Sequence, residues 1–98
     1  MSDEKKNEIK DEIINKINNI LIENDIPEIH NLTVINLNYQ TSFLGNIAVL
    51  DYNKLDKVEN QLNKLFKEYS SYSVRTEEVI SCCKPAYKNI SFKININK

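Results

Sequence analysis

The chain of 98 residues begins with apolar residues at helical spacing. From Asp3 to about Asn24 they recur every three or four positions, which places them in one stripe on a helix of 3.6 residues per turn. The stripe consists of Ile9, Ile13, Ile14, Ile17, Ile20 and Leu21. Asn24 and Pro27 are typical stop signals, because proline cannot continue a helix. The pattern predicts an amphipathic helix that packs one face on a core.

A second helical stripe, the most regular in the chain, runs over residues 55–69. Its apolar members are Leu55, Val58, Leu62, Leu65, Phe66 and Tyr69. Asn53 is a suitable capping residue, and Asp56 follows in the first turn, where the helix dipole favours a carboxylate. Ser70 and Ser71 end the pattern. We expect Leu62 to lie at the centre of the buried helix face.

Two segments between these helices have the composition of strands. Residues 32–39 and 43–52 are rich in β-branched and aromatic residues, and residues 40–42 separate them. The arrangement predicts an antiparallel hairpin with its turn at residues 40–42. Gly45 within the second segment indicates a bulge or a close approach of two backbones.

The last third of the chain also has strand character. Residues 72–82 look extended, residues 84–88 have the composition of a turn, and residues 90–96 alternate strictly between apolar and polar. The apolar side of the alternating run consists of Ile90, Phe92, Ile94 and Ile96. We predict a half-buried strand there. We also expect this strand to lie at an edge of the sheet, open to pairing with another chain.

The predicted order is α-β-β-α-β-β in a single domain over residues 1–98. Each helix has one apolar stripe, and each strand has at most one strongly apolar face. The simplest fold is therefore an α+β two-layer sandwich, with two helices packed on one face of a four-stranded, mainly antiparallel sheet.

Composition argues against several classes of function. Glycine, histidine and arginine occur once each, as Gly45, His30 and Arg75. Phosphate cradles need several glycines, and nucleic-acid readers usually cluster arginines. The net charge of −1 creates no field that would attract nucleic acid or an anionic membrane. We expect no cofactor and no small-molecule substrate, and the absence of a secretory or membrane-spanning pattern predicts a cytoplasmic protein.

Three groups of residues are candidates for chemistry. In a strand, Cys82 and Cys83 would point to opposite faces, so we expect one thiol in the core and structural roles for both. His30 is a lone histidine before the first strand, which is typical of a loop residue but also of a metal ligand. Glu77 and Glu78 have the residue types of an acid and base pair or of a cation site, or of a solvated strand end. We predict no metal site and no enzyme activity.

Residues 13–77 resemble the cytoplasmic C-terminal domain of cation diffusion facilitators. The resemblance rests on residues 29–34, with the sequence Ile-His-Asn-Leu-Thr-Val, on the helix of residues 55–69, and on residues 73–77, with the sequence Ser-Val-Arg-Thr-Glu. It implies a similar helix and strand order. Among that family's metal-binding positions only His30 has a counterpart here.

The remaining surface favours a non-enzymatic interaction module, acting as a homodimer or as a small subunit, inhibitor or adaptor of a larger protein. Tyrosine is enriched at interfaces because it combines an apolar ring with a polar tip. The predicted interface residues are Tyr39, Tyr72, Tyr87, Ile90, Phe92 and Ile94. The alternative, which the resemblance suggests, is a metal-responsive regulatory domain that uses His30 and one of Cys82 or Cys83.

Overall fold

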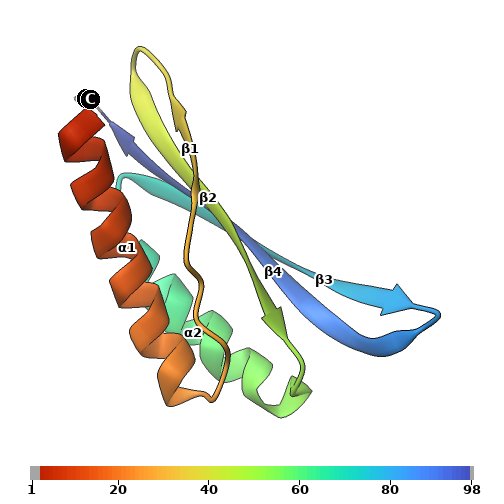
Figure 1. Cartoon of the computed structure of the whole chain (residues 1–98). Coiled ribbons are helices and arrows are strands. Elements are labelled where there is room, and N and C mark those ends of the chain that lie inside the picture. Colours follow the sequence, from red (N-terminus) through yellow and green to blue (C-terminus); the bar gives the residue numbers. More distant parts are fainter. Residues whose placement is uncertain (1–2, 98) are drawn as a thin grey trace.

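The computed structural model describes residues 3–97, apart from the side chains of Asp3, Ser81 and Lys84. Two helices lie on one side of a four-stranded sheet, which confirms the predicted α+β two-layer sandwich (Figure 1). The elements in chain order are α1 (Asp3–Glu23), β1 (Thr33–Asn36), β2 (Gln40–Val49), the 3-10 helix η1 (Tyr52–Lys54), α2 (Leu55–Phe66), β3 (Ser71–Ser81) and β4 (Lys84–Asn97).

The strand order is β1-β2-β4-β3, with every neighbouring pair antiparallel. β4 therefore lies inside the sheet, flanked by β2 and β3, and the prediction of an edge position for the last strand is wrong. Alternation along residues 90–96 reports that one face is buried, but it says nothing about which strands lie on either side. The edges of the sheet are β1 and β3.

The core fills the space between the helices and the sheet. Each helix contributes three fully buried apolar residues at the predicted spacing, and β2 and β4 contribute the facing surface. The members with no measurable exposure are Ile13, Ile17, Leu21, Phe43, Val49, Val58, Leu62, Phe66, Ile90 and Ile94. The predicted interface residues Ile90, Phe92 and Ile94 thus belong to the core, so their proposed role in partner binding is wrong.

The connections between elements depart from the predicted ones in two places. The β1–β2 turn lies at residues 37–39, where the Leu37 N–H donates to the Gln40 carbonyl at 2.8 Å, so residues 40–42 belong to β2. The residue that caps the second helical segment is Asp51, whose carboxylate accepts from the Asn53 N–H at 3.0 Å. Asn and Asp are common in turns and at helix caps, because their short side chains bond neighbouring backbone groups.

The β3–β4 hairpin turns at Cys82 and Cys83, and the predicted turn at residues 84–88 is instead part of β4. Val79 pairs with Tyr87 whereas Ser81 pairs with Lys84, so Pro85 and Ala86 together face one residue of β3. Such a bulge is a place where a strand tolerates proline, which has no N–H to donate. The end of this hairpin forms an arm that projects beyond the helices (Figure 1).

Candidate interaction surface

The sheet face turned away from the helices carries hydrogen-bonded polar ladders. Ser42 Oγ donates to Asn95 Oδ1 at 2.6 Å, and Asn95 Nδ2 donates to Ser71 Oγ at 2.9 Å, so one ladder joins β2, β4 and β3. A second ladder joins Asn46, Ser91 and Asn89 through contacts of 2.8–3.2 Å. Because these polar groups satisfy one another across the strands, they hold the sheet together and require no ligand.

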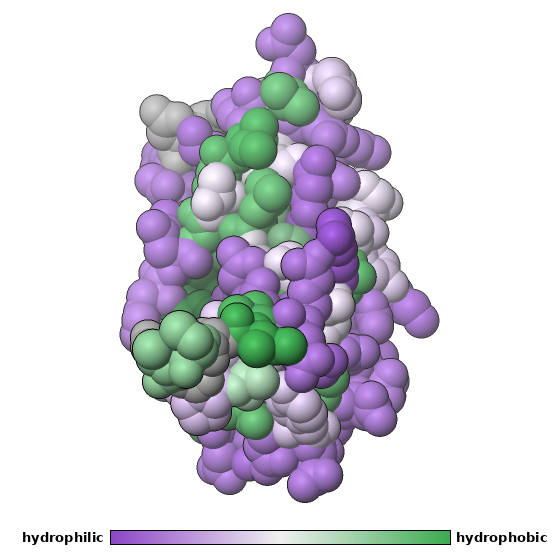
Figure 2. Space-filling view, turned by 90° about the vertical axis from the view of Figure 1, so that its right-hand side faces the viewer, coloured by the Kyte–Doolittle hydropathy of each residue, from purple (hydrophilic) through white to green (hydrophobic). Residues whose placement is uncertain are grey.

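Large apolar side chains are exposed at both ends of the sheet. On the face turned away from the helices, Figure 2 shows apolar residues bordered by hydrophilic ones. Near the β1–β2 turn the exposed ones are Ile35, Leu37 and Tyr39, and near the opposite end they are Leu50, Tyr52 and Ile80. Ile80 on the projecting arm is the most exposed of these side chains, at 78%.

Tyr52 fixes the base of the arm. Its hydroxyl donates to Glu78 Oε1 at 3.1 Å, and Lys88 Nζ lies 5.5 Å from the centre of its ring. Partial loss of water around the ring, together with the neighbouring Glu78 carboxylate, raises the pKa of Tyr52. The contact holds η1 against β3 and β4, and Ile80 lies two residues beyond it along β3.

The outer side of β3 is the longest unpaired sheet edge in the described part of the chain. β3 has eleven residues, whereas the other edge strand, β1, has four. β1 also leaves residues 45–49 of β2 without a neighbouring strand, and the loop residues Asn31 and Leu32 share a groove with the first two of them, Gly45 and Asn46. An unpaired strand presents a row of N–H and C=O groups, which is a template for pairing with another chain.

The charges on β3 lie in its middle and have both signs. Arg75 and Glu77 form an ion pair on the outer face, and the adjacent Glu78 projects to the helix face, where Lys88 Nζ lies 3.9 Å from Glu78 Oε2. Glu77 and Glu78 thus point to opposite sides of the sheet, so they do not form the acid and base pair that was one candidate.

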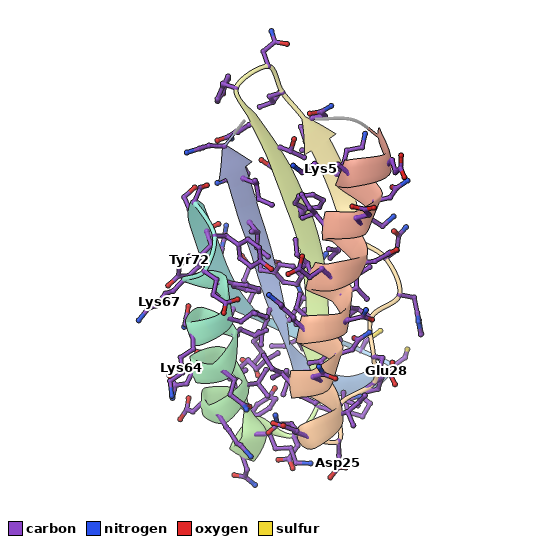
Figure 3. All side chains as sticks on the ribbon, turned by 90° about the vertical axis from the view of Figure 1, so that its left-hand side faces the viewer. Lys5, Asp25, Glu28, Lys64, Lys67 and Tyr72 are labelled. Atoms are coloured by element: carbon purple, nitrogen blue, oxygen red, sulfur yellow. The ribbon has the colours of Figure 1, made fainter. Side chains whose placement is uncertain are left out.

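A groove lies where α2 meets the start of β3. It has a volume of about 560 Å³ and is lined by Asn60, Asn63, Lys64, Lys67 and Tyr72. The Tyr72 ring packs on Phe66, with 5.9 Å between ring centres. Figure 3 shows Lys64, Lys67 and Tyr72 along the same side of the molecule. This end of the β3 edge is therefore basic, while the other half of the strand carries Glu77 and Glu78.

The three predicted interface tyrosines do not form one surface. Tyr39 is 69% exposed at the β1–β2 turn, Tyr72 is half-buried on β3, and Tyr87 is half-buried on β4 opposite Val79. Sequence reasoning missed Ile80 and the edge position of β3. Strand alternation could not have identified Ile80, because this residue lies on the helix face of β3 and is exposed only where the arm projects beyond the helices (Figure 1).

Cys82 and Cys83 are both exposed, with 3.3 Å between their Sγ atoms. The expectation that one thiol enters the core is wrong, because the pair forms the hairpin turn where strand alternation no longer applies. His30 is exposed in the loop between α1 and β1. Among the side chains that the structure describes, no three of His, Cys, Asp or Glu come together in a group that would hold a metal ion.

Neither α1 nor α2, the two α-helices of the described chain, is long and apolar enough to cross a bilayer. No known protein-family model matches the sequence, and no curated protein or solved structure is detectably similar to it. The likeness to the cytoplasmic domain of cation diffusion facilitators therefore stays a resemblance of order and of a short motif.

Proposed function

We propose that this protein is a non-enzymatic interaction module that binds a protein partner through the outer edge of β3. The observation that carries the proposal is the length of that edge: eleven residues, unpaired within the described chain. Addition of a partner strand to such an edge supplies affinity through main-chain hydrogen bonds, and the alternate side chains supply specificity.

The composition of β3 supports selective rather than indiscriminate pairing. Proline and glycine, which would blunt the edge, are absent from its sequence. Natural edge strands avoid aggregation by carrying charges, and here Arg75, Glu77 and Glu78 serve that purpose. Since these charges have both signs, they repel most strands but favour one with complementary charges in the right register.

The metal-responsive alternative has less support from the geometry. His30 lies in the α1–β1 loop and the thiols lie at the hairpin turn, and within residues 3–97 no larger ligand group forms around either. Tight zinc binding ordinarily takes three or four preorganised ligands. The interaction module is therefore the function that we put forward.

Site-directed photo-crosslinking in cells tests the proposal. A photoreactive amino acid is placed at Ser73 on β3 and, as a matched control, at Asn15, which is exposed on α1. We expect crosslinked products of defined mass from the β3 position and few from the α1 position. Equal yields from both positions, or no product from β3, would contradict the proposed function.

A further inference from the structure

We infer that the occupant of the β3 edge is a second copy of this chain, with the two β3 strands paired antiparallel about Thr76. The inference rests on the proposed function and specifies its partner and register. β3 runs from Ser71 to Ser81, so Thr76 is its central residue. A two-fold axis at Thr76 therefore overlaps all eleven residues of both strands, and each copy uses the same surface.

The charges on β3 favour the same register, and this argument is independent of the length of the strand. With Thr76 opposite its own copy, Arg75 of each chain lies opposite Glu77 of the other, on the outer face. Successive side chains of a strand point to opposite faces, so only shifts of one β3 strand by two residues relative to the other keep side chains of the same face opposite each other. A shift by two residues in one direction brings Arg75 opposite Arg75, and the same shift in the other direction brings Glu77 opposite Glu77. Like charges directly opposite each other destabilise a strand pair.

The apolar residues of the edge also find partners in this register. Ile80 of one copy lies opposite Tyr72 of the other, and both are on the helix face. Ile80 is 78% exposed within its own chain, and Tyr72 lines the groove between α2 and β3. The projecting arm of each copy lies beyond the helices of its own chain. In the dimer it is covered by the C-terminal end of the other copy's α2.

The charge distribution along the edge is consistent with antiparallel pairing. Lys64 and Lys67 line the groove at the start of β3, whereas Glu77 and Glu78 lie in its second half. Antiparallel pairing brings the acidic half of one copy to the basic end of the other. A parallel arrangement would instead bring the two acidic halves together.

A charge-exchange experiment on the whole chain tests the register. Arg75→Glu places glutamate opposite Glu77 at both symmetry-related positions, and Glu77→Arg places arginine opposite Arg75. Each variant alone should dimerise more weakly than the original chain, on the order of tenfold, because two facing pairs change from attractive to repulsive. A mixture of the two variants restores opposite charges at both positions and should form a heterodimer of near-original affinity.

Dissociation constants come from analytical ultracentrifugation, with Lys10→Glu and Glu8→Arg on α1 as charge-matched controls that should leave the affinity unchanged. Circular dichroism and the denaturation midpoint of each variant, measured at concentrations where it is monomeric, verify folding. In the original dimer, the β3 amides that do not pair with β4 should exchange at least on the order of tenfold more slowly than in the monomer.

The outcomes separate the inference from the proposed function. A mixture that associates no more tightly than the separate variants overturns the register. An original chain that stays monomeric at millimolar concentration, while Ser73 crosslinks to a different protein, overturns the homodimer and leaves the interaction module standing. If the chain neither self-associates nor gives crosslinks from β3, the homodimer inference and the proposed function are both overturned.

Discussion

The ring of Phe92 lies against Gly45, its pairing partner on the neighbouring strand, so closely that a Cβ on Gly45 would stand 2.5 Å from Phe92 Cζ. The same Cβ would stand 2.8 Å from Cδ2 of Leu32. The close approach at Gly45 is thus made by two side chains and not by a second backbone, and the pairing of β2 with β4 continues through it without a bulge. An aromatic ring placed over a strand glycine also shields the exposed backbone.

Replacing Gly45 by Ala should lower the free energy of unfolding by about 1–3 kcal/mol, because the added methyl group overpacks a buried site. Phe92 is 3% exposed and packs on Phe66, which leaves its ring little room to move. Urea denaturation measures the change. The loss should shrink in a Phe92→Leu background, where the shorter side chain vacates the contact, and an equal loss in both backgrounds would show that the ring is not its cause.

Truncation of Leu62 to Ala should lower the free energy of unfolding by about 2–4 kcal/mol, through lost burial and the cavity left behind. Leu62 is fully buried on α2, as its place in the helical stripe predicts. The change is measured by chemical denaturation, with the exposed α2 residue Lys57→Ala as control. A midpoint unchanged in Leu62→Ala would show that the helix packs by another face.

Asn18 anchors the loop that follows α1. Its Nδ2 donates to the Ile29 carbonyl at 2.9 Å, and its Oδ1 accepts from the Ile29 N–H at 2.8 Å, while the residue is only 8% exposed. Asn18→Ala should lower the free energy of unfolding by about 1–3 kcal/mol, because it leaves two backbone groups unsatisfied. Asn19→Ala, at the exposed neighbouring position, should change it by less than about 0.5 kcal/mol. Similar losses at both positions would show that the two hydrogen bonds of Asn18 are not the cause.

Both thiols should react with a water-soluble disulfide reagent in the native protein. Cys82 and Cys83 are exposed at the hairpin turn, so modification requires no unfolding. We expect two equivalents of thiol to be released at similar rates with and without denaturant. A second equivalent that appears only in denaturant would place one cysteine in the core, as strand alternation alone suggested.

Zinc should not bind tightly. We expect calorimetry to show no one-to-one binding of Zn²⁺ below about micromolar dissociation constant, since such affinity takes three or four preorganised ligands. Replacing both cysteines, one by Ser and one by Ala, should leave partner binding intact. Tight uptake that disappears in His30→Ala would instead favour the metal-responsive alternative.

The helices and the two-layer fold could be predicted because they depend on local periodicity. The apolar stripe that contains Leu62 can be identified from the sequence alone, and so can the apolar face of residues 90–96. Strand order depends on pairing between distant residues, such as Gln40 with Asn97, which no local pattern encodes. The edge at β3, and with it the candidate surface, was therefore beyond the reach of sequence patterns.

The prediction of the β3–β4 turn at residues 84–88 is wrong for a different reason. Lys84 and Pro85 have the composition of a turn, whereas two cysteines do not. The structure accommodates Pro85 at a bulge opposite Ile80, so the proline that suggested a turn lies within a strand. Because the turn lies at the cysteines and not after them, the thiol that was expected in the core is exposed like its neighbour.

The central position of β4 has a consequence for how the chain folds during synthesis. β1 and β2 can form their hairpin as soon as both have left the ribosome, but β3 pairs only with β4. β4 is also the last of the four strands to be made, so the nascent chain carries two incomplete pieces of sheet with unpaired edges until residues 84–97 emerge. Pairings between distant residues form slowly, and unpaired strands are prone to aggregate. Ribosome-associated chaperones that shield apolar strands would therefore act on β3 until β4 has emerged.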